Sequence, residues 1–219
     1  MGKSAILILM ARHWLVRIIV FASLIVNVFF GWNYYSGNTV VKVWDGDTFD
    51  LKNGTRVRLL DVESPEMGLC GAAAAKHRLE ELVLGKFVTV KELTYEEFNR
   101  HNGLVYQGNR LINAIMIKEG WGRLHYNPNS QKEALKAAYK FAQENKQGIF
   151  GMNCTDAESE NPKCQIKANI DEDTLKKSYH LPSCRDYDRV KIDRDRGEEF
   201  FCSEKEAQAA GFAKAYGCE

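Results

Sequence analysis

The spacing of hydrophobic and polar positions divides the chain into regions of different character. Residues 18–32 are apolar almost without interruption. From residue 40 onward, apolar positions alternate with polar ones, a pattern typical of half-buried strands. Apolar residues then recur at helical spacing over residues 72–84, 111–119 and 131–145. The pattern predicts an apolar N-terminal segment followed by a region of mixed strands and helices.

A β-hairpin is predicted over residues 40–66. Its turn is Asn53-Gly54, the strongest short signal for a two-residue hairpin connection. The return strand is expected over residues 55–62 and is ended by Pro65. Simple alternation along that strand places Arg58 on the same face as the even-numbered residues that follow it.

The hairpin gathers charged side chains near its ends. Three carboxylates and one guanidinium are expected in one neighbourhood, from Asp47, Glu63, Glu66 and Arg58. Carboxylate oxygens suit hard cations such as Ca²⁺ or Mg²⁺. A glutamate can act as general base on a water molecule, and an arginine can grip a phosphate oxygen. The cluster therefore predicts a site for a metal ion and a phosphate group.

Further candidates lie outside the hairpin. Arg100 lies in a polar stretch, residues 96–102, that is interpreted as a loop, and it offers a second phosphate clamp. Phe98 and Tyr126 offer faces on which bases can stack. His125 is not expected to be a ligand. Each charged residue also has an ordinary interpretation, because such side chains are common in turns and on strand surfaces.

The order of elements predicts an organisation in four parts. Residues 1–35 form an N-terminal segment, and residues 36–152 form the main domain. Short strands with two or three interspersed helices indicate a small, partly open β-barrel of the OB type for this domain. The polar, acidic residues 153–163 are expected to be a linker, and residues 164–219 a second unit.

Two helix starts carry the signature of a capping box, a serine followed three residues later by a glutamate. They are Ser130 with Glu133, and Ser203 with Glu206. The first is expected to begin the helix over residues 131–145, and the second a short helix in the C-terminal unit.

The N-terminal segment has a basic flank, Lys3, Arg12 and Arg17, before its apolar run. This combination is typical of a signal peptide or signal anchor. Aromatic residues crowd the place where a small-x-small cleavage site would lie, which favours an uncleaved membrane anchor. The flanking charges place the rest of the chain outside the cytoplasm. A cleaved signal, which would make the protein secreted, and a buried core helix stay open as alternatives.

Six cysteines agree with an oxidising compartment. They are Cys70, Cys154, Cys164, Cys184, Cys202 and Cys218. The C-terminal unit is near the size at which a small domain needs disulfides or a metal. The net charge of +1 gives no strong positive field, so a polyanionic substrate would need a cation or local arginine residues.

Two blocks of sequence form a specific joint pattern. The first is Asp45-Gly46-Asp47-Thr48 followed by Arg56-x-Arg58-Leu59-Leu60-x-Val62-Glu63-Ser64-Pro65-Glu66. The second runs from Asn99-Arg100 through Tyr106 to Leu111-Ile112-Asn113 and Gly120. Together they resemble the staphylococcal nuclease (thermonuclease-like) family over about residues 38–150.

The resemblance implies a five-stranded OB-fold β-barrel with about three helices. It also implies Ca²⁺-dependent cleavage of DNA and RNA phosphodiesters that leaves a 5′-hydroxyl and a 3′-phosphate. The implied calcium ligands are Asp47, Glu63 and the carbonyl of Ser64. The implied base is Glu66, the implied phosphate clamps are Arg58 and Arg100, and the implied nucleotide contacts are Phe98 and Tyr126. The family usually has an aspartate where this chain has Glu63, which puts the affinity for calcium, or the choice of metal, in question.

The C-terminal unit contains the motifs Ile166-Lys167-x-Asn169-Ile170, Tyr179-His180-x-Pro182-x-Cys184 and Phe200-Phe201-Cys202-Ser203-Glu204-x-Glu206-Ala207-x-Ala209-Ala210-Gly211-Phe212. With these motifs it resembles a small module often appended to bacterial thermonuclease-like proteins, and more faintly the zinc-binding N-terminal domain of the Ada DNA-repair protein. By composition His180, Cys184, Cys202 and Cys218 could bind Zn²⁺. Outside the cytoplasm disulfides are favoured over zinc, with Cys184–Cys218 and Cys154–Cys164 as the expected pairs.

The sequence thus predicts an α+β nuclease, anchored to a membrane, that acts on single-stranded or unstructured DNA and RNA as a monomer. The alternative is a non-catalytic OB module that binds single-stranded nucleic acid or protein. A structural envelope protein, with the C-terminal unit as its functional part, is a third possibility.

Overall fold

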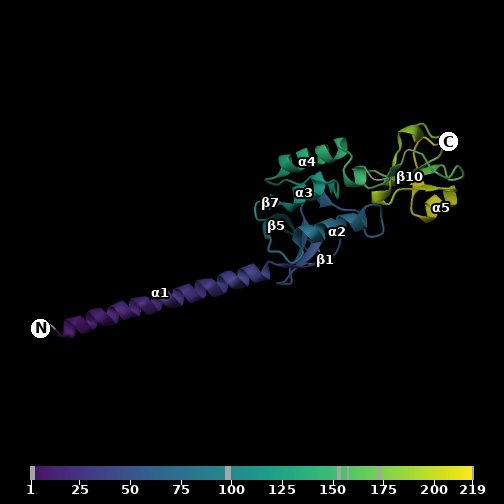
Figure 1. The fold of residues 1–219 in the computed structure, drawn as a ribbon. Coiled ribbons are helices and arrows are strands. Elements are labelled where there is room, and N and C mark those ends of the chain that lie inside the picture. The colour runs from purple at the N-terminus through teal and green to yellow at the C-terminus, as the bar shows by residue number, and fades with distance from the viewer. Residues whose placement is uncertain (1–2, 97–99, 152–153, 157, 172–173, 219) are drawn as a thin grey trace.

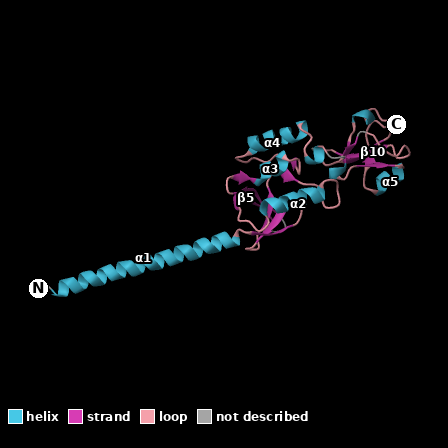
Figure 2. Ribbon diagram, in the orientation of Figure 1, coloured by secondary structure: helices cyan, strands magenta, loops and turns pink. Residues whose placement is uncertain are grey.

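The protein is described by a computed structural model that covers residues 3–96, 100–151, 154–156, 158–171 and 174–218. These residues form one long N-terminal helix, a central domain of strands and helices, and a small C-terminal module (Figure 1). Both folded parts mix helices with strands (Figure 2). The expectation of an α+β chain is therefore confirmed.

Helix α1 (Lys3–Gly37) projects away from the central domain, on the side opposite the C-terminal module (Figure 1). Its segment His13–Gly37 is long and apolar enough to cross a membrane, and none of it is buried within the protein. This exposure contradicts the alternative of a buried core helix. At its end, the ring of Tyr35 stacks on Phe87 of the central domain, with ring centroids 4.7 Å apart.

The main sheet has the strand order β1-β2-β3-β6-β5, and β7 pairs with the other end of β6. The pair β3–β6 is parallel, and the other pairs are antiparallel. The strands are β1 (Val40–Val43), β2 (Thr48–Leu51), β3 (Arg56–Leu59), β5 (Thr89–Glu96), β6 (Arg100–Gln107) and β7 (Arg110–Leu111).

The hairpin turn at Asn53-Gly54 is confirmed, and Gly54 has the positive φ of 88° that such a turn requires. The return strand is shorter than expected, because Asp61 adopts a left-handed backbone with φ 61°. The chain turns there and continues as β4 (Val62–Glu63), which pairs with β8 (Arg123–Leu124) instead of β2. The expected alternation beyond Arg58 is therefore wrong.

Three helices cover the strands of the central domain: α2 (Ala72–Val83), α3 (Ile112–Lys118) and α4 (Lys132–Glu144). All three were expected. The capping box at Ser130 is wrong, since α4 begins after Gln131 without a side-chain cap. The backbone N–H of Ser130 instead donates to a carboxylate oxygen of Glu92, at 3.1 Å.

The core of the central domain lies between the sheet and these helices. Its large, fully buried side chains come from strands and helices alike, and include Phe49, Leu59, Leu79, Leu104, Met116 and Leu135. Asn113 of α3 is buried among them. Its side chain accepts from the N–H of Val105 and donates to the carbonyls of Leu60 and Gly103. This one amide therefore ties α3 to β6 and to the end of β3.

The C-terminal module is built on a four-stranded sheet of order β13-β10-β11-β14. Its strands are β10 (Ile166–Ile170), β11 (Lys177–His180), β13 (Glu199–Phe201) and β14 (Ala213–Lys214). Helix α5 (Glu204–Ala209) begins with the expected capping box of Ser203 and Glu206. The 3₁₀ helices η2 (Gly148–Phe150), η3 (Tyr187–Arg189) and η4 (Arg194–Arg196) complete the chain.

The stretch expected to be a linker carries structure. Within it, β9 (Thr155–Asp156) pairs with β12 (Ile192–Asp193) of the C-terminal module. Cys154, just before β9, forms a disulfide with Cys70 of the central domain. The disulfide therefore fixes this stretch to the central domain, and the strand pair fixes it to the C-terminal module.

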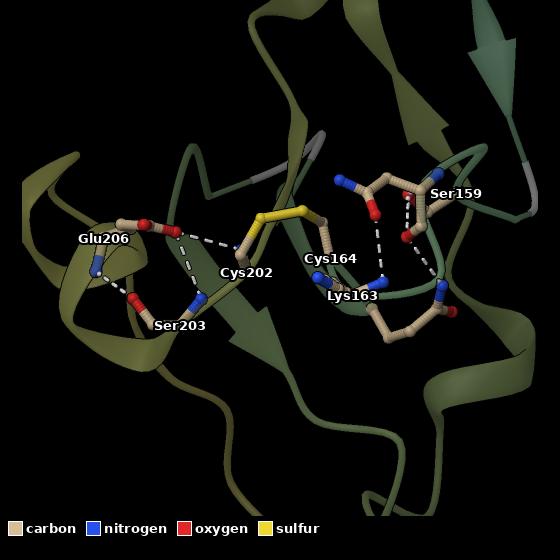
Figure 3. The surroundings of a disulfide bond; sticks show 8 residues. Ser159, Lys163, Cys164, Cys202, Ser203 and Glu206 are labelled. Carbon is tan, nitrogen blue, oxygen red and sulfur yellow. Dashed lines mark hydrogen bonds between the residues drawn. A yellow bond between two sulfur atoms is a disulfide. The ribbon is translucent and has the colours of Figure 1, made fainter.

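The cysteines form the pairs Cys70–Cys154, Cys164–Cys202 and Cys184–Cys218. The expected pair Cys184–Cys218 is confirmed, and Cys154–Cys164 is wrong. Antiparallel pairing of β10 with β13 brings Cys164 beside Cys202, at the capped start of α5 (Figure 3). Sequence distance is thus a poor guide here, because the sheet register selects the partner.

Candidate active site

The turn between β1 and β2 positions Asp47. The carboxylate of Asp45 accepts hydrogen bonds from the N–H groups of Asp47 and Thr48, at 3.0 and 2.7 Å. A Cβ at Gly46 would lie 2.6 Å from the Cβ of Ala75 and 2.7 Å from the Cβ of Ser64. Only glycine fits this close approach, so the turn packs tightly against α2 and the segment after β4.

The carboxylate of Asp47 is the most heavily bonded group of the site. One oxygen accepts from the Thr48 hydroxyl at 2.7 Å and lies 2.9 Å from the Arg58 guanidinium. The other accepts from both the N–H and the hydroxyl of Ser64, each at 3.0 Å. Asp47 therefore ties the β1–β2 turn to β3 and to the segment after β4.

Asp47 is only 1% exposed, and this burial raises the pKa of its carboxyl to about 6. The Arg58 guanidinium and the hydrogen bonds from Ser64 and Thr48 lower the pKa, and the neighbouring Asp45 raises it further. A positive charge beside this carboxyl favours its ionised form.

The parallel pairing of β3 with β6 brings Arg58 and Arg100 together. In this register Arg56 lies opposite Arg100, and Arg58 opposite Asn102. Arg100 is therefore the first residue of a strand, which corrects the expectation that it lies in a loop. The physical reason is that β5 and β6 pair with each other up to Glu96 and Arg100. The polar residues on either side of residues 97–99 therefore belong to paired strands.

Four of the expected site residues line one cavity of about 380 Å³: Arg58, Glu63, Glu66 and Arg100. Glu63 and Glu66 are exposed, whereas both arginines are half-buried. Two arginines and two glutamates thus line one open space, and Arg58 connects it to the buried Asp47. This arrangement suits a phosphate group and a water molecule.

The segment between Glu63 and Cys70 is held at both ends, and Glu66 in its middle is exposed. Ser64 is buried and bonded to Asp47, as described above. Glu66 is exposed, and its carbonyl accepts from the N–H of Leu69 at 2.9 Å. The disulfide Cys70–Cys154 then holds the far end of the segment.

The two expected stacking residues have different outcomes. Tyr126 is 60% exposed and lines a neighbouring cavity of about 460 Å³ together with Glu63. An exposed ring beside the site can stack on a base. Phe98 lies outside the residues that the structure describes.

Sequence reasoning missed Asp61 and gave His125 no place in the site. The buried carboxylate of Asp61 accepts hydrogen bonds from the Asn127 N–H, the Asn127 side chain and the Asn129 side chain, at 3.0, 2.8 and 2.6 Å. This network holds the loop that carries His125 and Tyr126 over the site. His125 lines both cavities next to Glu63. An aspartate between apolar residues of an expected strand was the available signal.

The two candidate metal sites differ in whether their residues can bind a metal ion. Asp47, Glu63 and Ser64 supply hard oxygen donors, which match calcium in chemistry. In the part of the chain that the structure describes, His180, Cys184 and Cys218 form the only metal-like cluster with ligand atoms within 4.8 Å. Cys184 and Cys218 are bonded to each other, so their sulfurs are not thiolates that could bind zinc. The zinc alternative for this module is therefore wrong.

Comparison with known proteins adds independent information. A micrococcal nuclease from Shigella flexneri is 35% identical over an alignment of 109 residues, and the match covers 43% of this chain and 62% of the relative. An uncharacterized endonuclease from Escherichia coli O157:H7 is 29% identical over 117 residues, 51% of this chain and 74% of the relative. Protein ParB from Escherichia coli is 29% identical over an alignment of 111 residues, and the match covers 44% of this chain and 63% of the relative.

The chain therefore spans less than two thirds of the length of the Shigella relative. Residues 56–151 match the family model described as staphylococcal nuclease homologue, and this segment contains Arg58, Glu63, Glu66 and Arg100. The chain therefore contains a domain that is similar to the staphylococcal nuclease-like family.

Proposed function

We propose that the protein is a nuclease that hydrolyses phosphodiester bonds of DNA and RNA. The observation that carries the proposal is the cavity that Arg58, Arg100, Glu63 and Glu66 share, in which Arg58 is paired with the buried Asp47. It lies in a domain whose relatives bear the names nuclease and endonuclease. A module that only binds nucleic acid would not need two glutamates in the same cavity as two arginines.

In this proposal Arg58 and Arg100 hold the scissile phosphate and stabilise the charge that builds on its oxygens during attack. Glu66 takes a proton from a water molecule, and the water oxygen forms a bond to phosphorus. The bond from phosphorus to the 5′ oxygen breaks, and that oxygen takes a proton. The products are a 3′-phosphate and a 5′-hydroxyl.

The oxygen donors of the site fit a hard cation, and we propose Ca²⁺. The carboxylates of Asp47 and Glu63 and the carbonyl of Ser64 would hold it. When bound, calcium neutralises charge on the phosphate. The pair Arg58–Asp47 keeps the guanidinium beside this ligand set.

We also propose that the central domain is an OB-type barrel held at a membrane by α1. The sheet order and the parallel pair β3–β6 support the barrel, as does a bridge between Thr39 and Phe87 beside the outer strands. The apolar exposed face of α1 and three disulfides support an anchored domain outside the cytoplasm. A secreted form after cleavage is the alternative.

The test is the full chain in detergent with single-stranded DNA and RNA, with added Ca²⁺ or with EDTA. We expect cleavage that needs calcium, leaves 3′-phosphate ends and disappears in Glu66→Gln. Binding without cleavage under any divalent ion would overturn the proposal and favour a binding module. Cleavage that persists in EDTA would overturn the role of the metal.

A further inference from the structure

The C-terminal module lies directly against the candidate active site. Arg123 of β8 stands opposite Glu63 in the β4–β8 register. Its guanidinium forms two hydrogen bonds to the carboxylate of Asp195 in η4, at 2.8 and 3.1 Å, and lies 3.0 Å from Asp193. Asp195 is 4% exposed, so this contact is a buried joint between the two parts. The joint lies one strand away from Glu63.

The joint places Arg196 beside the site. Within η4, Arg194 pairs with Asp156 at 2.7 Å, and Asp195 pairs with Arg123. The next residue, Arg196, lines two cavities of about 170 and 460 Å³, and Glu63 lines both of them as well. Gly197 follows with φ 80° and ends the turn. The position of Arg196 is therefore set by the docking of η4.

The larger of these cavities has the composition of a nucleotide subsite. Besides Arg196 it is lined by the exposed Tyr126 and by His125 of the loop that Asp61 holds. A guanidinium binds phosphate oxygens, and an exposed tyrosine ring stacks on a base. Glu63 also lines the cavity of Arg58 and Arg100. A nucleic-acid strand that lies across Glu63 would thus run from the cavity of Arg58 and Arg100 into the cavity of Arg196.

We propose that Arg196 of the C-terminal module contacts a second phosphate of the substrate, in a nucleotide subsite built by both folded parts. The subsite extends the proposed nuclease site, so this inference rests on that function for its substrate class. The module thus adds length to the binding groove. Its overall charge is acidic, but the carboxylates of Asp193 and Asp195 are paired with Arg123, which offsets their charge. Chemistry at the first phosphate does not need Arg196.

The experiment measures binding separately from cleavage. The full chain with Glu66→Gln is titrated with a fluorescent single-stranded DNA oligonucleotide and with a dinucleotide that has one phosphodiester bond, at several salt concentrations. Addition of Arg196→Gln is expected to weaken oligonucleotide binding about tenfold. The slope of log affinity against log salt should become shallower by about 0.7, the value for one lost phosphate contact to a single strand. Dinucleotide binding should stay unchanged.

The matched control is Arg189→Gln, which removes an equal charge from an 86% exposed arginine of the same module. It should bind both ligands like the parent. Arg196→Lys keeps the charge without the guanidinium fork and should show an intermediate loss of oligonucleotide affinity. This variant tests the subsite even if Arg196→Gln fails to fold. Equal losses of affinity for the oligonucleotide and the dinucleotide would overturn the subsite. So would unchanged oligonucleotide affinity in both Arg196→Gln and Arg196→Lys.

The outcome also distinguishes this inference from the proposed function. If the wild-type chain cleaves nucleic acid and Arg196→Gln binds like the parent, the subsite fails alone. If the wild-type chain does not cleave nucleic acid, but Arg196→Gln weakens binding of the oligonucleotide and not of the dinucleotide, the subsite stands and the nuclease proposal fails.

Discussion

The guanidinium of Arg58 lies 2.9 Å from the carboxylate of Asp47, which is 1% exposed. The two residues lie on opposite arms of one hairpin, and the turn before β2 and the register of β2 with β3 bring them together. The pair gives Arg58 a fixed position at the edge of the cavity that Glu63, Glu66 and Arg100 also line.

Loss of Arg58 should therefore affect catalysis much more than loss of the neighbouring arginine. We expect Arg58→Ala to lower kcat about 10²- to 10³-fold, the range for removal of one group that stabilises transition-state charge. Arg56→Ala is the control on the same strand, because Arg56 pairs with Asp50 and not with Asp47. Initial rates on single-stranded DNA with calcium compare the two. Equal losses would mean that strand charge, not the position of Arg58, matters.

The joint between the two folded parts should contribute strongly to stability. Arg123→Ala leaves the carboxylate of Asp195 buried and without its bidentate partner, so we expect a loss of about 3–5 kcal/mol in the free energy of unfolding. Urea unfolding of the full chain in detergent measures it. Arg189→Ala, at an exposed pair in the same module, should leave the midpoint unchanged. A small effect of Arg123→Ala would show that the joint opens readily in solution.

The disulfide Cys70–Cys154 should stabilise the protein and the segment that carries Glu66. We expect the double variant Cys70→Ala, Cys154→Ala to lose about 2–4 kcal/mol in the free energy of unfolding, since the bond closes a long loop. Removal of Cys184–Cys218 should cost less by the same reasoning, because its loop is shorter. The comparison of both double variants by urea unfolding, with activity measured on the folded fraction, tests the order. The reverse order would assign the main stabilisation to the C-terminal module.

The stability of the C-terminal module should fall in mild acid. Burial lowers the pKa of His180 below its ordinary value of 6.5, and Lys167 lowers it further while Asp186 raises it. The unfolded chain therefore takes up a proton at His180 before the folded chain does. We expect stability to be full above about pH 6.5 and to decline as the pH falls below that value.

Urea midpoints between pH 5 and 8 measure this dependence. His180→Gln should flatten it, whereas His77→Gln, at a side chain that is 73% exposed, should leave it unchanged. A pH profile that is the same in the His180 variant and the wild type would contradict the assignment.

Much of the local structure follows from the sequence alone. The turn at Asn53-Gly54 needs a positive φ that glycine adopts at low cost, and the helices have apolar residues at helical spacing. The capping box at Ser203 is likewise a local signal, because donor and acceptor lie within one turn. These features depend on neighbouring residues only, so a pattern along the chain is sufficient to predict them.

The tertiary structure decided what depends on contacts between distant segments. The left-handed backbone at Asp61 ends the hairpin early, and its carboxylate is bonded to a loop more than sixty residues away. Pairing of β10 with β13 selects Cys202, not Cys154, as the partner of Cys164.

The sequence thus determined which chemical groups the site contains: Asp47, Glu63, Glu66 and two arginines. Only the fold decided that β6 places Arg100 beside β3 and that η4 places Arg196 beside Glu63. The physical reason is that strand register and docking are set by packing and buried ion pairs between remote residues. No spacing along the chain records those interactions.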